Sequence, residues 1–231
     1  MKSLLREGVD TIFGYPGGAI MPVYDALYDY KDSIRHVLVR HEQGAAHAAE
    51  GYSWLGDKPG VCMVTSGPGA TNLVTGITNA MCDSTPIVCI TGQVVTTALG
   101  TDAFQEAPII GIVTPVTKWC YQITNAAEIS HIVAKAFHIA TSGRKGPVLI
   151  DITKDAQLEL CEYDDSVQKV ALKSRHDPHY QKKLKRAAAL LNNAKRPYVL
   201  FGHGIALGNA ESELAQFIEK GGFPAASTLL G

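Results

Sequence analysis

The sequence predicts an α/β protein, with a doubly wound parallel sheet followed by the start of a second α/β domain. Short apolar runs alternate with segments in which hydrophobic residues recur at helical spacing. Runs such as residues 86–91 are continuously apolar, as expected for strands covered on both faces. Glycine-rich or polar turns follow the runs, and in a parallel sheet such turns gather at the carboxyl edge.

The elements of the first domain follow in order along the chain. Residues 1–8 have the character of the last turns of a helix, which Gly8 would close. Hydrophobic patterns bounded by turn residues then predict strands at 9–15, 34–39, 60–65, 86–91, 117–123 and 147–152, and helices at 20–27, 45–55, 73–81 and 126–142.

Residues from about 158 to 178 lose this periodicity and become polar, which indicates a linker. A basic amphipathic helix at 180–192, a strand at 197–202, a helix at 210–221 and a strand beginning at 223 follow it. We therefore predict a first domain at 1–158, a linker at 159–178 and an incomplete second domain at 179–231. Because residues 228–231 stop where a strand gives way to a turn, we expect the chain to be a piece of a longer protein.

Composition narrows the class of protein. A net charge of -1 offers no field for nucleic acid or an anionic membrane. The 5 cysteines are scattered without C-x-x-C pairs, so the sequence suggests neither a zinc site nor a disulfide framework. A reducing compartment fits this pattern best. The N-terminus is too charged for a signal peptide, and no apolar run approaches a membrane span. We expect a soluble, cytoplasmic protein.

Glu42 is the first candidate functional residue, because it stands where an apolar run turns into an Ala-rich helix. One interpretation is a helix-start acid, stabilised by unpaired backbone N–H groups and the helix dipole. The other is a carboxylate directed into the crevice at the carboxyl edge of the sheet, where open α/β folds bind ligands.

Two glycine turns belong to the same edge. Residues 16–18 (Pro-Gly-Gly) form either a plain tight turn or a place where the backbone approaches a bound ring or phosphate. Residues 66–72 match neither the dinucleotide fingerprint nor a Walker loop. Thr71 and Asn72 could cap the next helix or offer polar groups to a ligand. The polar loop 100–106 carries an aromatic residue and could reach over the site.

Five motifs in order resemble the catalytic subunit of the acetohydroxyacid synthase (acetolactate synthase) family of thiamine diphosphate enzymes. They are residues 13–27, 40–44, 65–72, 100–106 and 143–155. The resemblance implies a pyrimidine-binding domain up to about residue 158 and then the opening of a central domain associated with FAD. The domain that binds the diphosphate and Mg²⁺ would be absent, so no metal ligand is assigned in this chain.

The resemblance also implies an activity: decarboxylation of pyruvate and ligation to a second pyruvate or to 2-ketobutyrate, the first common step of branched-chain amino-acid biosynthesis. Active sites in this family form between the subunits of a homodimer, and a small regulatory subunit is a possible partner. Glu42 would exchange a proton with the cofactor's pyrimidine ring. The other implied contacts are Tyr15, Pro16, Gly17 and Gly18 along the cofactor, Pro68 and Asn72 at its pyrimidine end, Phe104 and Gln105 at the acceptor pocket, Lys154 at the entrance, and Arg144, Gly202 and Gly204 at FAD.

Alternatives remain open at several of these positions. For Lys154 the alternative is a solvated surface lysine. Val95 and His203 depart from the family, where proline and glycine are usual, so inhibitor response and close flavin approach could differ. The rival functions are a catabolic, FAD-free acetolactate synthase or another thiamine carboligase, and an inactive binding module if the chain exists alone.

Overall fold

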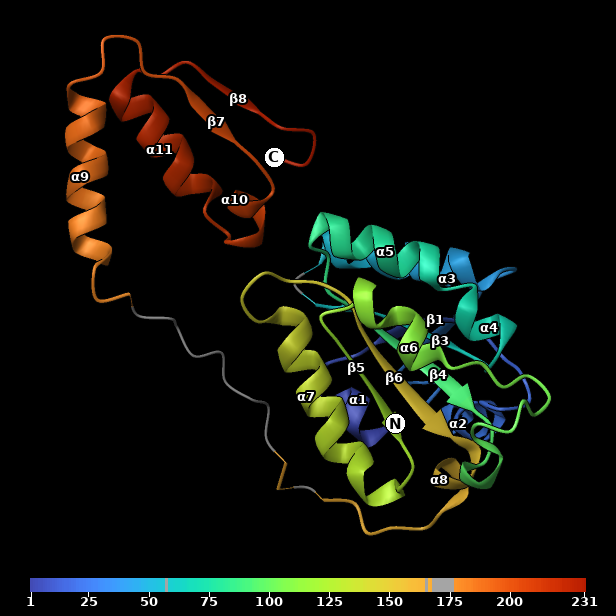
Figure 1. Ribbon diagram of the computed structural model, residues 1–231. Helices are drawn as coiled ribbons and strands as arrows, with labels where there is room; N and C mark the ends of the chain where they lie inside the picture. Colours follow the sequence, from blue (N-terminus) through green and yellow to red (C-terminus); the bar gives the residue numbers. More distant parts are fainter. Residues whose placement is uncertain (57, 165, 168–176) are drawn as a thin grey trace. The chain divides into compact units, whose positions relative to one another are not determined.

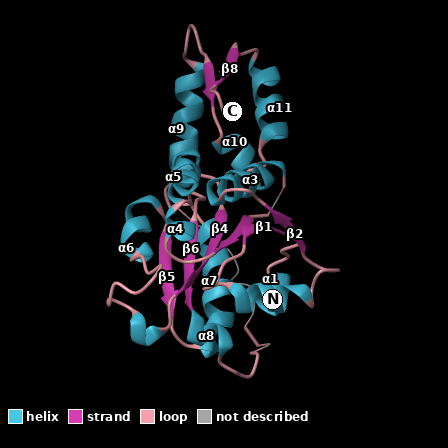
Figure 2. Ribbon diagram, turned by 90° about the vertical axis from the view of Figure 1, so that its right-hand side faces the viewer, coloured by secondary structure: helices cyan, strands magenta, loops and turns pink. Residues whose placement is uncertain are grey.

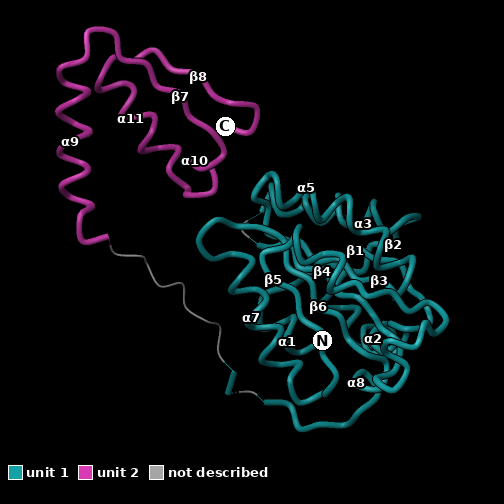
Figure 3. The backbone as a smooth tube through the Cα atoms, in the orientation of Figure 1, with its two compact units in different colours: residues 1–172 teal, residues 173–231 magenta. Residues whose placement is uncertain are grey.

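The computed structural model describes residues 1–56, 58–164, 166–167 and 177–231. The chain divides into two compact units, Met1–Leu172 and Lys173–Gly231 (Figure 3). Half of the predicted linker, residues 165 and 168–176, lies outside the described residues. The boundaries proposed at 158 and 178 therefore stay predictions.

Within the described part of the first unit, parallel strands form one sheet in the order β2-β1-β3-β4-β6-β5 (Figure 1). Each strand lies inside or close to its predicted range, although β4 extends two residues beyond residue 91. Strands β3, β4 and β6 are buried along their whole length. The bounds are β1 Thr11–Tyr15, β2 Arg35–Leu38, β3 Gly60–Val64, β4 Ile87–Gln93, β5 Trp119–Ile123 and β6 Val148–Thr153.

The helices of the first unit largely match the prediction. The expected helix at 73–81 is preceded by a separate short helix, and the start of the expected helix at 126–142 is a 3₁₀ turn capped by Asn125. The five-residue helices α6 and α8 were not predicted, because so short a segment carries no clear period. The bounds are α1 Lys2–Arg6, α2 Met21–Tyr28, α3 Glu42–Leu55, α4 Pro68–Thr71, α5 Val74–Asp83, α6 Ile109–Val113, α7 Ile129–Thr141 and α8 Lys154–Leu158, with 3₁₀ turns η1 Thr96–Ala98, η2 Thr114–Val116 and η3 Ala126–Glu128.

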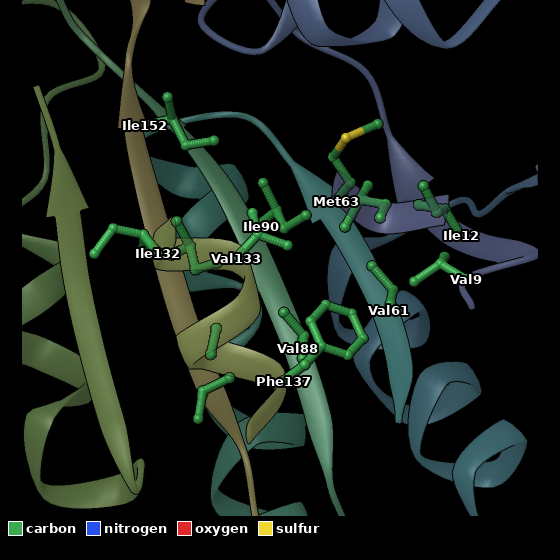
Figure 4. Packing of buried hydrophobic residues seen from close by; sticks show 14 of the residues in the cluster. Val9, Ile12, Val61, Met63, Val88, Ile90, Ile132, Val133, Phe137 and Ile152 are labelled. Atoms are coloured by element: carbon green, nitrogen blue, oxygen red, sulfur yellow. The ribbon is translucent and has the colours of Figure 1, made fainter. Parts of the chain in front are cut away.

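Helices cover both faces of the sheet, which confirms the doubly wound architecture. On one face, α1, α2, α7 and α8 bury their apolar side chains against the strands. Figure 4 shows Val61 and Met63 of β3 and Val88 and Ile90 of β4 facing the same layer as Phe137 of α7. On the other face, α3, α4, α5 and α6 pack over alternate residues of β3, β4 and β6.

Small residues bring α3 very close to the sheet. Ala45, Ala46 and Ala49 are fully buried on its inner side. A Cβ atom at Gly60 of β3 would lie 1.8 Å from the carbonyl oxygen of Ala49, so only glycine permits this approach. A Cβ at Gly76 of α5 would lie 2.4 Å from Cβ of Ala46. These contacts fix α3, and therefore its first residue Glu42, at a set depth above the strands.

The second unit contains the elements predicted for it. Strands β7 Val199–Phe201 and β8 Ala225–Ser227 pair in parallel, and helices α9 Tyr180–Asn192 and α11 Glu211–Gly221 accompany them, with an additional short helix α10 Gly204–Leu207 (Figure 2). Gly222 ends α11 in the left-handed conformation, as the glycine pair at that point indicates. In the described residues, no helix is long and apolar enough to cross a membrane.

Candidate active site

The carboxyl edge of the sheet collects most of the predicted site residues. Strands β1 and β3 are parallel neighbours, with Tyr15 opposite Val64, so the glycine turns that follow them leave the sheet at the same edge. The chain reverses its direction of winding between these strands, because β2 lies beyond β1 and β4 beyond β3. In open α/β sheets this switch point is where ligands bind.

Glu42 is the first residue of α3, three residues earlier than the predicted start of the helix. His41 caps the helix, because its Nδ1 accepts a hydrogen bond from the backbone N–H of Gln43 at 3.1 Å. Only 8% of Glu42 is exposed. The acid therefore satisfies both interpretations of its position: it begins a helix, and it is buried at the edge of the sheet where a ligand would lie.

Asn72 orients the Glu42 carboxylate. Its Nδ2 donates a hydrogen bond to Oε2 of Glu42 at 2.9 Å. The alternative that Thr71 or Asn72 caps the start of the next helix is wrong, since α5 has no side-chain cap and Thr71 donates to the carbonyl of Pro68. On the other side of the carboxylate, a Cβ at Gly69 would lie 3.4 Å from Oε1 of Glu42.

The first glycine turn is held by side chains that sequence reasoning missed. The backbone N–H of Ala19 donates to Oγ1 of Thr65 at 3.2 Å, and its carbonyl accepts from Nε2 of Gln157 at 2.7 Å. A Cβ at Gly17 would lie 2.6 Å from Thr65, so this glycine is required by packing within the protein. A Cβ at Gly18 would meet nothing within 4 Å in the described structure, which leaves space on that side of the turn.

Thr65 could have been found from its place directly after a buried strand. Gln157 carried no signal, because its partner Ala19 is 138 residues away. The exposed positions of this edge include Pro16 and Pro68 of the two turns and Tyr15 at the end of β1.

The loop at 100–106 lies directly against the second glycine turn. Gly67 has a positive φ of 57°, and a Cβ there would lie 2.6 Å from the carbonyl oxygen of Gln105. Gln105 itself has a left-handed φ of 61°. The Glu106 carboxylate accepts hydrogen bonds from backbone N–H groups, first that of Gly100 and then those of Ala103 and Thr101, and these lower its pKa. The structure thus brings the backbone of Gln105 to the site, whereas the side chain of Phe104 is 89% exposed.

Lys154 and Arg144 flank β6 at opposite ends. Lys154 follows the strand and begins α8, half-buried at the carboxyl edge. Arg144 precedes the strand and lies at the amino edge, away from Glu42, where its Nε donates to Oγ of Ser84 at 2.7 Å. Its Nη2 donates to the carbonyls of Met81 and Cys82 at 3.2 Å each. These carbonyls belong to the last turn of α5, where they have no partner within the helix. Arg144 therefore does not belong to the Glu42 cluster.

Gly202 and Gly204 belong to the second unit. A Cβ at Gly202 would lie 2.9 Å from Oγ1 of Thr228, and one at Gly204 would meet nothing within 4 Å among the described residues. Among all the residues that the structure describes, no group of three or more His, Cys, Asp or Glu side chains is placed to hold a metal ion.

Comparison with known families identifies the chain. Residues 1–112 match the N-terminal TPP binding domain of thiamine pyrophosphate enzymes, and residues 184–231 match the central domain of the same enzymes. The chain belongs to the thiamine pyrophosphate enzyme family. The first match ends at residue 112, although the sheet continues through β5 and β6.

Individual members of this family are similar to the whole chain. The chain is 48% identical to an acetolactate synthase of Arthrospira platensis, 47% to one of Mycobacterium bovis and 45% to a chloroplastic one of Arabidopsis thaliana. Each similarity covers 100% of the chain but only 41%, 37% and 34% of the relative. The chain therefore spans about two fifths or less of the length of these relatives.

The residues at this edge fit thiamine pyrophosphate, also called thiamine diphosphate, the cofactor for which the matching N-terminal domain is named. A buried carboxylate is present, and Gly18 leaves open space at the neighbouring turn. Oγ of Ser66, in the second glycine turn, is buried and has no hydrogen-bond partner in the described structure. An unpaired buried hydroxyl is costly, so its presence supports a polar ligand at this edge.

Proposed function

We propose that the polypeptide containing this chain is an acetolactate synthase that acts with thiamine diphosphate. It would decarboxylate pyruvate and join the remaining fragment to a second pyruvate or to 2-ketobutyrate, at the first common step of branched-chain amino-acid biosynthesis. The observation that carries the proposal is the buried Glu42 carboxylate, oriented by Asn72 at the switch point of a thiamine-pyrophosphate-binding domain. Identities of 45–48% over the whole chain to acetolactate synthases support the choice of reaction.

When bound, thiamine diphosphate supplies the acidic thiazolium carbon at which a 2-keto acid can lose carbon dioxide. The protein's part is to handle a proton at the cofactor's pyrimidine ring. Glu42 would hold that proton on one carboxyl oxygen and exchange it with a ring nitrogen. The hydrogen bond from Asn72 to Oε2 keeps the carboxyl group in one orientation, and the glycine at 69 leaves Oε1 without a side chain above it.

The keto acids would be bound by groups around the same edge. We assign Phe104 and Gln105 to the acceptor pocket and Lys154 to the entrance, where a cation would attract a substrate carboxylate. Tyr15, Pro16, Gly17, Gly18 and Pro68 would contact the cofactor, and the Mg²⁺ that holds its diphosphate would be bound by a part of the protein beyond this chain.

We also propose that a second subunit completes the site in a homodimer. Large apolar side chains at the carboxyl edge are exposed, with 40% of Tyr15, 59% of Leu38 and 89% of Phe104 accessible. Exposed apolar groups gathered at one edge favour coverage by another protein surface. A small regulatory subunit and a cytoplasmic location stay predictions from the sequence.

FAD is the proposed second cofactor, with a structural rather than a redox role. Arg144 would contact it, since guanidinium groups bind phosphate and hydroxyl oxygens well, and Gly202 and Gly204 would line it in the central domain. Flavin absorbance in the purified full-length protein would support this assignment. A protein that makes acetolactate without flavin would instead be the FAD-free enzyme.

The central test compares acetolactate formation from pyruvate by the full-length wild type and its Glu42→Gln variant, with thiamine diphosphate, Mg²⁺ and FAD supplied. Glutamine can still accept from Asn72 but loses the exchangeable proton, so we expect a loss of at least about 100-fold in kcat/KM. Glu50→Gln is the matched control. Glu50 is also buried on α3 and accepts from an asparagine of α5, Asn79, at 2.8 and 2.9 Å, but it lies two turns from the edge.

The outcomes separate the hypotheses. Activity that is lost in Glu42→Gln and retained in Glu50→Gln supports the proton role. Equal activity in the wild type and Glu42→Gln would leave Glu42 as a helix-start acid only. A full-length wild type that makes no acetolactate under these conditions would favour a noncatalytic binding module.

A further inference from the structure

We propose that Gln93, held in place by the buried Asp151, is a positioning residue for the loop of residues 94–107, which carries Phe104 and Gln105. The proposal rests on the function proposed above in one respect: it assumes that this loop borders the keto-acid site. The physical link between Gln93, Asp151 and the loop stands on the geometry alone.

Asp151 is a fully buried carboxylate on β6, between β4 and β5. Its Oδ1 accepts from Thr91 of β4 at 2.6 Å, and its Oδ2 accepts from Gln93 of β4 at 3.2 Å and from Gln122 of β5 at 2.8 Å. Salt bridges in the described structure do not include Asp151. Burial consequently raises its pKa to about 6, against the three hydrogen bonds that lower it. Such a group is costly for a stable core, which suggests that it serves another purpose.

Gln93 uses its whole amide to connect three parts of the chain. Its Nε2 donates both to Asp151 and to the carbonyl of Ala107 at 3.0 Å, while its Oε1 accepts from the N–H of Val94 at 2.9 Å. Only 2% of Gln93 is exposed. An amide with two N–H groups and one oxygen engaged has a single orientation, which Asp151, the carbonyl of Ala107 and the N–H of Val94 fix together.

The loop is clamped at both ends and in its middle. At the entrance, the N–H of Thr96 donates to both oxygens of Asp155 at 3.1 Å. In the middle, Glu106 gathers backbone N–H groups of residues 100–103. At the exit, the carbonyl of Ala107 accepts from Nε2 of Gln93 at 3.0 Å and from the backbone N–H of Ile109 at 2.7 Å, so Gln93 is its side-chain partner. Gln105 lies only two residues before this exit, and its backbone packs directly against Gly67. Releasing the exit would therefore let Gln105 move relative to the site.

Gln122 offers a control within the same cluster. It donates to the same oxygen of Asp151 as Gln93 does, but from β5 and without a hydrogen bond to the loop in the described structure. A purely structural cluster would respond alike to the loss of either glutamine. A positioning role predicts different responses, since only Gln93 reaches the loop.

The experiment compares Gln93→Met and Gln122→Met in the full-length protein with its cofactors. The readouts are hydrogen–deuterium exchange of the amides of residues 94–107, and kcat and KM for pyruvate. We expect Gln93→Met to speed exchange in the loop by about 10-fold and to lower kcat/KM by about 10- to 100-fold, because small displacements of substrate-positioning groups are expensive. Gln122→Met should leave both quantities within about 2-fold of the wild type.

Asp151 variants provide a rescue test. Asp151→Asn keeps an oxygen that can accept from both glutamines, so it should retain the slow exchange of the loop. Asp151→Ala removes that oxygen and should resemble Gln93→Met. If Gln93→Met does not fold, Gln93→Asn takes its place, since the shorter amide stays polar but cannot span from Asp151 to Ala107.

Equal effects of Gln93→Met and Gln122→Met, or unchanged loop exchange in Gln93→Met, would overturn the proposal. The exchange readout requires no turnover. An inactive wild type would therefore refute the proposed function, while exchange that is faster only in Gln93→Met would still support the link between Gln93 and the loop.

Discussion

Replacing Asp151 by asparagine should change how the stability of the protein depends on pH. Burial raises the pKa of Asp151 from 3.8 to about 6 in the folded state. Between these values the folded protein holds a proton that the unfolded chain has released, so the free energy of unfolding falls as the pH rises through this window. A pKa change from 3.8 to about 6 corresponds to about 3 kcal/mol of unfolding free energy. This stability is lost between roughly pH 4 and pH 6, and the loss stays constant above that range.

Asparagine does not titrate, so the Asp151→Asn variant should lack this loss. The measurement is the free energy of unfolding in urea for the wild type and the variant from pH 4 to pH 7. The difference between the two proteins should shift by up to about 3 kcal/mol in favour of the variant over this range. Any pH-independent effect of the substitution on hydrogen bonding cancels, because only the change of the difference with pH is used.

Asp155 provides a control of opposite sign. Its pKa is lowered, because hydrogen bonds, above all those with Thr96, outweigh the cost of burial. Its contribution to stability is therefore present above its ordinary pKa and is lost as the pH falls through the lowered value, and Asp155→Asn should remove that loss. Parallel pH profiles for the wild type and Asp151→Asn would refute the assignment of a raised pKa to the buried carboxyl group.

Two further predictions concern packing and burial. Gly60→Ala should lower the free energy of unfolding by about 3 kcal/mol or more, since its Cβ would overlap the carbonyl of Ala49. Gly18→Ala should change the free energy of unfolding by less than about 0.5 kcal/mol, because a Cβ there meets nothing within 4 Å among the described residues. Urea melts of both variants check this contrast. In the native protein, iodoacetamide should label the exposed Cys82 but not the buried Cys89. The pKa of Cys89 is raised by a hydrogen bond with the thiol of Cys62 and by burial. Modification of Cys89 without unfolding would contradict its burial.

Much of the fold could be predicted from local patterns. The continuous hydrophobic run at 86–91 predicts a strand covered on both faces, and the structure buries β4 along its whole length between β3 and β6. The position of Glu42 at a strand-to-helix junction was likewise evident, since an apolar run and an Ala-rich segment meet there. The exact start of α3 was not, because the cap at His41 depends on a side-chain rotamer.

The polar clusters were much harder to predict. In the sequence, Asp151 is one polar residue within an apolar strand, and only its hydrogen-bond partners make it a distinctive group of the core. Thr91, Gln93 and Gln122 lie 60, 58 and 29 residues away from it in the chain. No local pattern connects residues at such separations.

Local sequence patterns are enough to predict the alternation of strands and helices and the glycine turns, because periodicity and turn chemistry are properties of neighbouring residues. The family was indicated by the resemblance of five motifs. The pairing of polar groups is visible only in three dimensions: Asn72 meets Glu42, Gln157 meets the first glycine turn, and Gln93 meets both Asp151 and the loop. The physical reason is that a buried donor must find an acceptor in space, and the order of strands in the sheet sets which acceptors lie within reach.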